Sequence, residues 1–249
     1  MFSIQDRNLI RDYVLQLAKS DARVVAGAVV GSLARSDGDR WSDLDLTFAV
    51  ADGDPVSDVL EEWTSNIIKQ FSATRLFDLP RGASIYRVFL LPGCLQFDLS
   101  FTPASKFGAT GPKFKLLFGT AVEKPYPEPP DAQELFGYAV HHALRARFCI
   151  ERGRYWQAEY WISGTRDYAL HLACLRRNLP ASEGRGFDDL PSEIRDVFNS
   201  AFVANLTRDE LLRALGCVVA GLLHETEDVQ ELASKVKSQL LELTAEWDT

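Results

Sequence analysis

The order of apolar and polar residues divides the chain into two parts. Between residues 24 and 101, short runs alternate apolar and polar residues, whereas beyond residue 131 apolar positions recur at three- and four-residue steps. A two-residue period indicates a strand with one buried face, and the longer period indicates amphipathic helices. The pattern therefore predicts an N-terminal part that mixes strands with helices and a C-terminal part made of helices.

The periodicity also predicts the individual elements. In the first part we expect helices over residues 4–20 and 56–71, and strands over residues 24–30, 43–50, 84–91 and 95–101. The last two strands are joined by Pro92-Gly93-Cys94 as a hairpin-like turn. In the second part we expect helices over residues 131–151, 154–178, 191–203, 207–224 and 229–247, with Thr207 and Glu210 forming a capping box.

A proline-rich segment over residues 124–130 separates the two parts. Repeated prolines favour extended, semi-rigid chain and exclude helix, so we place the domain boundary there. The expected fold class is α+β. Residues 1–124 form an α/β domain with a small mixed sheet, and residues 131–249 form an all-α helical bundle. Because apolar residues lie on nearly every side of the helix over residues 154–178, we expect that helix to be largely buried.

Candidate chemistry gathers between residues 29 and 50. Asp43 and Asp45 alternate with apolar residues at the start of a strand, so both carboxylates share one face. Paired carboxylates on a rigid strand suit Mg²⁺, which proteins hold through one or two carboxylates together with substrate phosphates. Gly31 and Ser32 follow the preceding strand, where a glycine lets the backbone approach a polyphosphate.

These residues carry a resemblance to a known family. Gly31-Ser32, ten further residues and then Asp43-Leu44-Asp45 resemble the signature of the DNA polymerase β-type nucleotidyltransferase superfamily. The surrounding Gly-Ser-Leu-Ala-Arg and Trp-Ser-Asp-Leu-Asp-Leu are similar to its bacterial small-molecule branch, which modifies aminoglycoside- and lincosamide-like antibiotics. The chain departs from the pattern at Ser36, where family members often carry a glycine, and this bears on the shape of the loop.

The resemblance implies an enzyme of the nucleotidyltransferase class. It would move AMP, or another nucleoside monophosphate, from a nucleoside triphosphate to a hydroxyl of a small acceptor, with antibiotic resistance as a biological role. The implied metal is Mg²⁺, in two copies, and ATP is the co-substrate. A helical domain that binds the acceptor would close over the catalytic domain, leaving a cleft between the two.

A third carboxylate completes the expected metal set. Asp98 stands on the polar face of an otherwise apolar strand, repeating the pattern around Asp43 and Asp45. A two-metal site needs protein oxygens on the nucleophile side, and Asp98 matches the position of the third acid in the resembling family. We therefore predict Asp43, Asp45 and Asp98 as the metal ligands and catalytic acids.

Further residues are candidates for the nucleotide and for proton transfer. Arg35 lies in the same motif as Gly31 and Ser32, and Lys113 lies in a segment punctuated by glycines and prolines. That segment is either a mobile cover that brings Lys113 near the triphosphate or a plain connecting loop. Glu159, on a C-terminal helix, is a candidate general base by its position in the resembling family; the alternative is an internal ion-pair network.

The composition narrows the range of binding partners that we expect. The net charge is −8, and no run of Lys and Arg occurs, so the attraction to phosphates that drives nucleic-acid binding is weak. A cationic small molecule is a more natural partner. The four cysteines contain no Cys-x-x-Cys pair, which is typical of reduced, mostly packed thiols in a cytoplasmic protein. No signal peptide or membrane span is indicated.

Two other functions remain open from the sequence. Within the same fold, the chain could modify a protein or tRNA as part of a toxin–antitoxin system. From a different class, it could be a non-catalytic nucleotide-binding regulatory module that retains a remnant site. The sequence leaves open which hydroxyl acceptor is used, which nucleotide is the donor and what the oligomeric state is.

Overall fold

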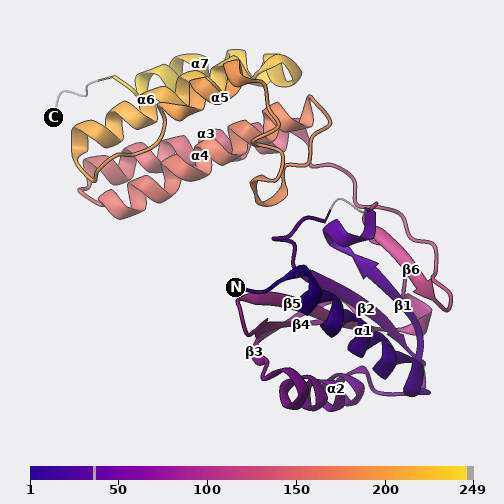
Figure 1. The fold of residues 1–249 in the computed structure, drawn as a ribbon. Helices are drawn as coiled ribbons and strands as arrows, with labels where there is room; N and C mark the ends of the chain where they lie inside the picture. The colour runs from indigo at the N-terminus through magenta and orange to yellow at the C-terminus, as the bar shows by residue number, and fades with distance from the viewer. Residues whose placement is uncertain (36–37, 246–249) are drawn as a thin grey trace. The chain divides into compact units, whose positions relative to one another are not determined.

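The computed structural model describes residues 1–35 and 38–245. Two compact units divide the chain, Met1–Pro127 and Glu128–Thr249, and each is described here by itself (Figure 1). The departure from the family pattern at Ser36 lies outside the described residues. Trp247, at the expected end of the last helix, also lies outside them.

The first unit is built on one mixed sheet. Its elements are α1 (Ile4–Ser20), β1 (Val24–Val30), η1 (Gly31–Arg35), β2 (Leu44–Val50), α2 (Val56–Phe71), β3 (Thr74–Arg81), β4 (Ser84–Leu91), β5 (Leu95–Pro103), η2 (Ala104–Lys106) and β6 (Phe114–Phe118). The strand order is β3-β4-β5-β2-β1-β6. Strands β2 and β5 pair in parallel, and all other neighbours are antiparallel.

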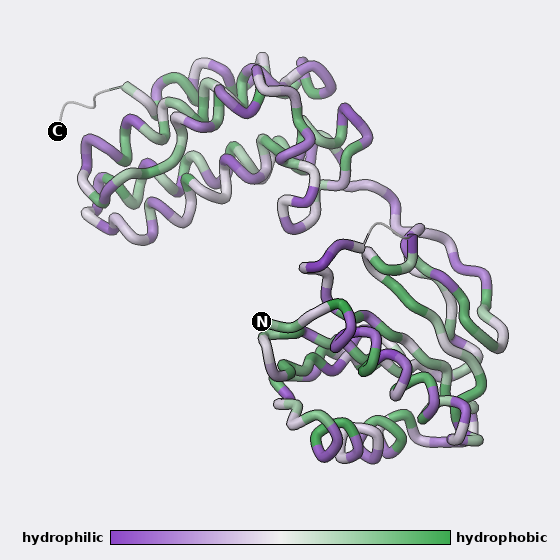
Figure 2. The backbone as a smooth tube through the Cα atoms, viewed as in Figure 1, coloured by the Kyte–Doolittle hydropathy of each residue, from purple (hydrophilic) through white to green (hydrophobic). Residues whose placement is uncertain are grey.

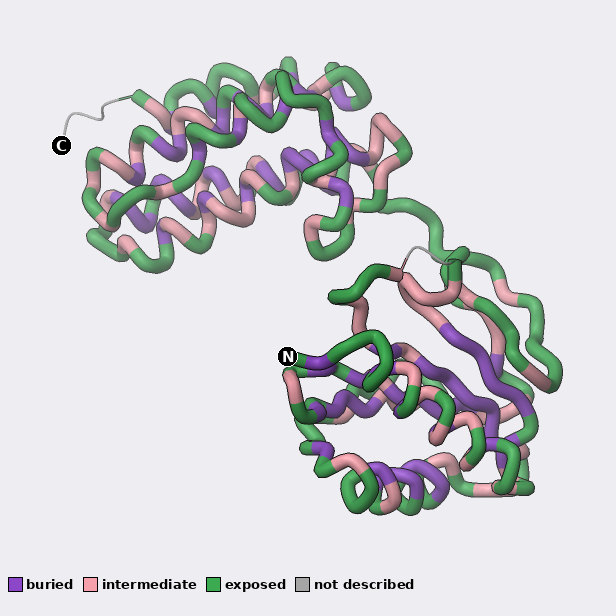
Figure 3. The backbone as a smooth tube through the Cα atoms, in the orientation of Figure 1, coloured by how far each residue is buried: buried purple, intermediate pink, exposed green. Residues whose placement is uncertain are grey.

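Helices α1 and α2 cover one face of this sheet. The period of two in β2 and β5 sends Leu44, Leu46, Phe48 and the facing apolar residues of β5 into a core with both helices. The central strands are accordingly buried along most of their length (Figure 3). The opposite face of the sheet carries the polar residues of the same strands, including Asp45 and Asp98.

The hairpin of β4 and β5 forms as expected. Both strands are antiparallel neighbours, and Gly93 and Cys94 in the turn have φ angles of 77° and 64°. Positive φ at two successive turn residues matches the right-handed twist of the flanking strands. The prediction of this hairpin is confirmed, although β5 runs two residues beyond Phe101.

Two strands were not expected from the sequence. Strand β3 is an edge strand, and nearly all of its residues are exposed, so its apolar residues show no buried period. Strand β6 lies in the segment that carries Lys113 and pairs with β1, where Gly27 faces Phe118. The interpretation of the whole segment as a cover or a loop is therefore wrong for residues 114–118.

The second unit consists of helices. Its elements are α3 (Ala132–Glu151), α4 (Tyr155–Leu175), η3 (Ser182–Gly184), α5 (Ser192–Asn199), α6 (Arg208–His224), η4 (Glu227–Val229) and α7 (Gln230–Glu242). Apolar and polar residues alternate along the helices (Figure 2), and the buried residues of α3, α4 and α6 form one core.

Most residues of helix α4 are buried or half-buried, as expected, although Trp156 and Tyr160 in its first half have exposed fractions of 81% and 64%. The expectation about the start of α6 is wrong. The capping box at the start of α6 does not form. The Thr207 hydroxyl instead donates to Asn205, and the Glu210 carboxylate accepts hydrogen bonds from the Ala204 amide and Arg213.

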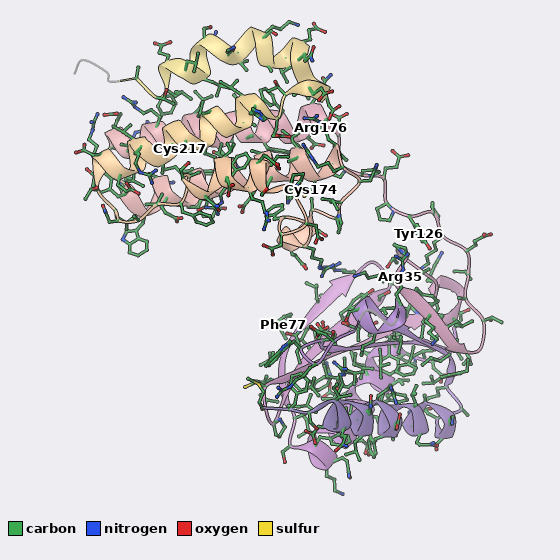
Figure 4. All side chains as sticks on the ribbon, turned by 45° about the horizontal axis from the view of Figure 1, so that its top comes forward. Arg35, Phe77, Tyr126, Cys174, Arg176 and Cys217 are labelled. Atoms are coloured by element: carbon green, nitrogen blue, oxygen red, sulfur yellow. The ribbon has the colours of Figure 1, made fainter. Side chains whose placement is uncertain are left out.

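The expected fold class is confirmed by these elements, an α/β part with a mixed sheet followed by an all-α part. The cysteines are all free, with Cys149 and Cys174 buried and Cys94 exposed. Cys174 and Cys217 are labelled in Figure 4. No helix among the described residues is long and apolar enough to cross a lipid bilayer.

A charge network at the end of α1 generates a prediction about stability. Asp21 accepts hydrogen bonds from the Arg23 guanidinium at 2.8 and 2.7 Å and from the Trp63 indole at 2.9 Å. The Arg23 hydrogen bonds, partly opposed by burial, lower the pKa of Asp21 from 3.8 to about 2. The carboxylate therefore stabilises the fold above pH 3.8, and this stabilisation is lost as the pH falls through about 2.

We expect Asp21→Asn to lower the free energy of unfolding at neutral pH by roughly 2 kcal/mol. Urea unfolding at several pH values measures this, and the difference from wild type should shrink as the pH falls below 3.8. Asp12→Asn is the control, because Asp12 is 64% exposed and pairs with its neighbour Arg11. Equal effects of the two substitutions would contradict the prediction.

Candidate metal and nucleotide site

Three carboxylates meet on the face of the sheet opposite α1 and α2. Asp43 immediately precedes β2, Asp45 lies in β2, and Asp98 lies in β5 directly beside Asp45 in the parallel register. One carboxylate oxygen from each lies within 4.8 Å of the others, and all three residues are half-buried. The structure thus brings together the three acids that the sequence singles out.

A single row of side chains runs from this acid cluster towards the edge of the sheet. Asp45 pairs with Asp98, Asp98 pairs with Val88 of β4, and Val88 pairs with Phe77 of β3. Residues that pair directly across a sheet share a face, so Phe77 (labelled in Figure 4) lies two strand spacings from Asp98, about 10 Å. Phe77 is 52% exposed, so the acid cluster continues into an apolar surface.

The electrostatics of the acid cluster favour a bound cation. Burial raises the pKa of Asp98, the negative charge of Asp43 raises it further, and a hydrogen bond from Gln96 opposes both effects. Gln96 Nε2 donates to Asp98 Oδ1 at 3.0 Å from the same face of β5. Like charges that are partly removed from water repel one another, and a divalent cation among them would relieve this repulsion.

The donor set fits Mg²⁺. All three candidate ligands are carboxylate oxygens, which hard divalent cations prefer, and two of them come from adjacent strands of one sheet. A sheet holds its side chains at fixed spacings, and Mg²⁺ demands near-ideal octahedral geometry. Asp43, Asp45 and Asp98 are thus able to hold this metal.

The backbone of Gly31 passes close to the acid cluster. Gly31 has a φ of 70°, and a Cβ atom at this position would lie 2.3 Å from Asp45 Oδ2. Only glycine meets both conditions, because other residues are strained at positive φ and would collide with the carboxylate. The glycine of the motif is therefore required by its contact with Asp45.

Ser32 adds an unpartnered polar atom at the same place. Its hydroxyl oxygen is buried and has no hydrogen-bond partner within residues 1–35 and 38–245. Buried polar groups are normally hydrogen-bonded, and an exception calls for an explanation such as a missing ligand. The hydroxyl is free to donate to a phosphate oxygen that lies beside Gly31.

The structure also brings the segment that carries Lys113 to the motif. The Gly31 amide donates to the Lys113 carbonyl at 3.2 Å, and Arg35 Nε donates to the Pro112 carbonyl at 3.1 Å. The side chains of Arg35 (Figure 4) and Lys113 are exposed. Both positive charges therefore lie on the chain segments that flank Gly31, where a polyphosphate would need them.

One supporting residue was missed by the sequence analysis. Arg7 of α1 is only 4% exposed, and its Nη1 donates to the carbonyls of Asp39 at 2.9 Å and Ser42 at 2.6 Å. These bonds hold the loop that leads into Asp43. The sequence carried a signal, since Arg7 stands three residues before Ile10 on the buried side of α1.

Glu159, the candidate base, belongs to α4 of the second unit. Its carboxylate is half-buried and accepts a hydrogen bond of 2.6 Å from the Ser163 hydroxyl, one turn further along the helix. The hydrogen bond fixes the carboxylate on α4. The assignment of Glu159 to proton transfer stays a prediction.

Comparisons with known proteins find a resemblance among solved structures. No family model matches the chain, and no curated protein matches its sequence. Among solved structures, the chain is similar to the crystal structure of an aminoglycoside 6-adenyltransferase from Bacillus subtilis, with a TM-score of 0.42 and 14% identity over 96% of this chain and 99% of that chain. At this level of similarity, an assignment of activity depends on the site of this chain alone.

Because Gly31 lies against Asp45, adding one methyl group at Gly31 should strongly affect stability and nucleotide binding. Gly31→Ala should lower the free energy of unfolding by about 1–3 kcal/mol, through positive-φ strain and the contact with Asp45, and should weaken Mg²⁺-dependent binding of ATP. Thermal unfolding and calorimetric titration measure the two effects. Gly53→Ala is the control, because no atom lies within 4 Å of its added Cβ. Normal nucleotide binding by Gly31→Ala would contradict the role of Gly31.

The raised pKa of Asp98 predicts an unusual gain in stability. A carboxyl with a raised pKa in the folded state costs stability once it ionises, so the cost appears as the pH rises through that pKa. Asp98→Asn should therefore raise the melting temperature in EDTA at neutral pH, and this gain should vanish in strong acid.

Added Mg²⁺ provides the complementary measurement. The metal should stabilise the wild-type protein and should have little effect on the melting temperature of Asp98→Asn. Asp58→Asn is the control, since Asp58 is an exposed acid in the first turn of α2. An equal response of Asp98→Asn and wild type to Mg²⁺ would remove Asp98 from the ligand set.

Proposed function

We propose that the chain transfers a nucleoside monophosphate, AMP from ATP, to a hydroxyl group of a small acceptor and releases pyrophosphate. The observation that carries this proposal is the acid cluster of Asp43, Asp45 and Asp98 beside Gly31, whose backbone has a positive φ, and the unpartnered hydroxyl of Ser32. Metal-assisted phosphoryl chemistry has two requirements. These are carboxylates that hold a hard cation and a backbone that a phosphate can approach closely.

The proposed roles follow from the donor set. Asp43 and Asp45 would share two Mg²⁺ ions, and Asp98 would hold the one on the nucleophile side. Bound there, the metal would supply positive charge to the attacking and leaving oxygens. Ser32 and the backbone of Gly31 would bind the triphosphate, and Arg35 and Lys113 would neutralise its outer charges.

The reaction balances with one bond made and one broken. The acceptor oxygen attacks the α-phosphorus of ATP, the bond from that phosphorus to the bridging oxygen breaks, and pyrophosphate leaves with the electron pair. The hydroxyl proton passes to a base, for which we propose Glu159.

A small acceptor suits the charge of the chain. At a net charge of −8, a long phosphate backbone is repelled, whereas a cationic acceptor such as an aminoglycoside-like antibiotic is attracted. We therefore propose a small hydroxylated cation as the acceptor, with antibiotic resistance as the biological role.

Transfer of label from [α-³²P]ATP tests the proposal. With Mg²⁺ and a panel of hydroxylated amines, label should move to a small molecule, and Asp45→Asn should abolish the transfer. Asp58→Asn should retain it. Label on protein or tRNA would favour a toxin-type enzyme, and ATP binding without any transfer would favour a regulatory module; either result would overturn the proposal.

Glu159→Gln separates proton transfer from metal binding. The substitution should lower kcat by about 10²–10⁴-fold, because general-base catalysis contributes that much, and should leave the dissociation constant of Mg²⁺-ATP unchanged. Glu193→Gln, at an exposed position of α5, is the control. An unchanged kcat in Glu159→Gln would make Glu159 structural.

A further inference from the structure

A pocket of about 610 Å³ lies within the helical unit. Its floor is one stripe of α4, formed by residues at positions 160, 163, 164, 167, 168 and 171. These positions are three and four residues apart, so they lie on the same side of the helix. His142 of α3 and residues 183, 184 and 187 of the loop before α5 complete the wall.

The pocket exists because two residues of the stripe are small. Ser163 and Gly164 occupy the middle of the floor, and Tyr160 and His171 stand at its ends. A Cβ atom on Gly164 would lie 2.3 Å from His142 Nδ1, so the glycine provides the room in which the His142 ring sits. A helix interior disfavours glycine by roughly 1 kcal/mol relative to alanine, and the packing of His142 is the local reason for it.

Aromatic rings form a continuous wall. His142 lies edge-to-face on Tyr168 at a centroid distance of 5.0 Å, Tyr168 lies 6.1 Å from His171, and His171 lies 5.6 Å from Phe187. Such a wall offers both ring faces and ring edges, which suits a planar aromatic ligand. The volume is that of a site for a drug-sized molecule.

The charged side chains that line the pocket are negative, and its histidines are neutral. Burial lowers the pKa of His142 and of His171, so both imidazoles are neutral near pH 7. The charged side chains that line the pocket are those of Asp167 and Glu183, both acidic. Each contacts a neighbouring arginine, Arg166 at 3.3 Å and Arg185 at 2.6 Å, in exposed pairs that contribute little stability.

Backbone strain in the wall supports a binding role for the pocket. His142 Nδ1 has no hydrogen-bond partner among the described residues, but it is buried against Gly164 and not open to a ligand in the pocket. In the loop, Glu183 has a φ of 59°, a left-handed conformation that costs a residue other than glycine about 1 kcal/mol or more. The strained residue lies in the wall of the pocket.

We propose that this pocket binds an aromatic amine. The ring packs against Tyr168 and Phe187, and the ammonium group lies near Asp167 and Glu183. Ammonium groups are attracted both to carboxylates and to the faces of aromatic rings. The site is complete within the helical unit, so the inference stands independently of nucleotidyl transfer.

Three probes test the chemistry by isothermal titration calorimetry on the full-length chain. Tryptamine carries both an aromatic ring and an ammonium group, indole-3-acetate replaces the ammonium group by a carboxylate, and putrescine has no ring. Tryptamine should bind at least about tenfold more tightly than either of the others. Failure of tryptamine to saturate a site, or equal binding of indole-3-acetate or putrescine, would overturn the proposal.

Matched variants locate the binding. Gly164→Ala should weaken tryptamine binding at least about tenfold, since the new methyl group displaces the His142 ring. Gly216→Ala, at a glycine of α6 with open space around it, should leave binding unchanged. Equal binding by the two variants would place tryptamine elsewhere and overturn the assignment.

Asp167→Asn keeps the proposal testable if Gly164→Ala fails to fold. It should weaken tryptamine binding by about three- to tenfold and leave binding of uncharged 3-ethylindole unchanged. Equal loss for both probes would remove the ammonium contact from the proposal. Asp45→Asn should bind tryptamine normally, so that a failure of nucleotidyl transfer and a failure of this pocket remain distinguishable.

Discussion

The parallel pairing of β2 with β5 is the constraint on which the candidate site depends. Its register places Asp45 directly beside Asp98, and the period of two sends the intervening Leu44 and Leu46 to the opposite face. Burial of that apolar face against α1 and α2 fixes the register, because a slip by one residue would expose the core and bury the acids. The same hydrophobic interaction that folds the sheet therefore sets the spacing of the carboxylates.

The acid cluster carries a cost that the fold has to offset. The carboxylates lie within 4.8 Å of one another, and Gly31 is held at positive φ against Asp45. Arg7 holds the loop before Asp43 through two backbone carbonyls, and Gln96 donates to Asp98. These contacts fix the positions from which the three acids would hold a cation.

The sequence predicts much of this unit because local patterns and long-range packing agree there. Helices α1 and α2 begin and end at the expected residues, and Asp43, Asp45 and Asp98 meet as their faces indicate. Strand β3 escaped prediction because an exposed edge strand has no buried period, and β6 because glycines and prolines precede it.

In the helical unit, the predictions from the sequence failed where a side chain does not have the environment or the hydrogen-bond partner that its residue type suggests. Trp156 and Tyr160 are large and aromatic, yet they are exposed, so an apolar side chain on nearly every side of α4 did not mean burial of each one. Thr207 and Glu210 have the spacing of a capping box, but Arg213 and the Ala204 amide compete for the Glu210 carboxylate. The pocket beside α4 could not be predicted from the periodicity of apolar residues, because the small size of Gly164 matters only where His142 packs against it.

The acid cluster and the pocket beside α4 would select their proposed ligands by different physical means. Three crowded carboxylates concentrate negative charge at one point, and each is attracted twice as strongly by a dication as by a monovalent ammonium group at the same distance. The pocket of α4 has carboxylates only beside aromatic rings and neutral imidazoles, which give Mg²⁺ too few oxygen ligands but suit a weakly hydrated organic cation. If both proposals hold, each site would favour its own ligand through its charge and donor set rather than through its shape.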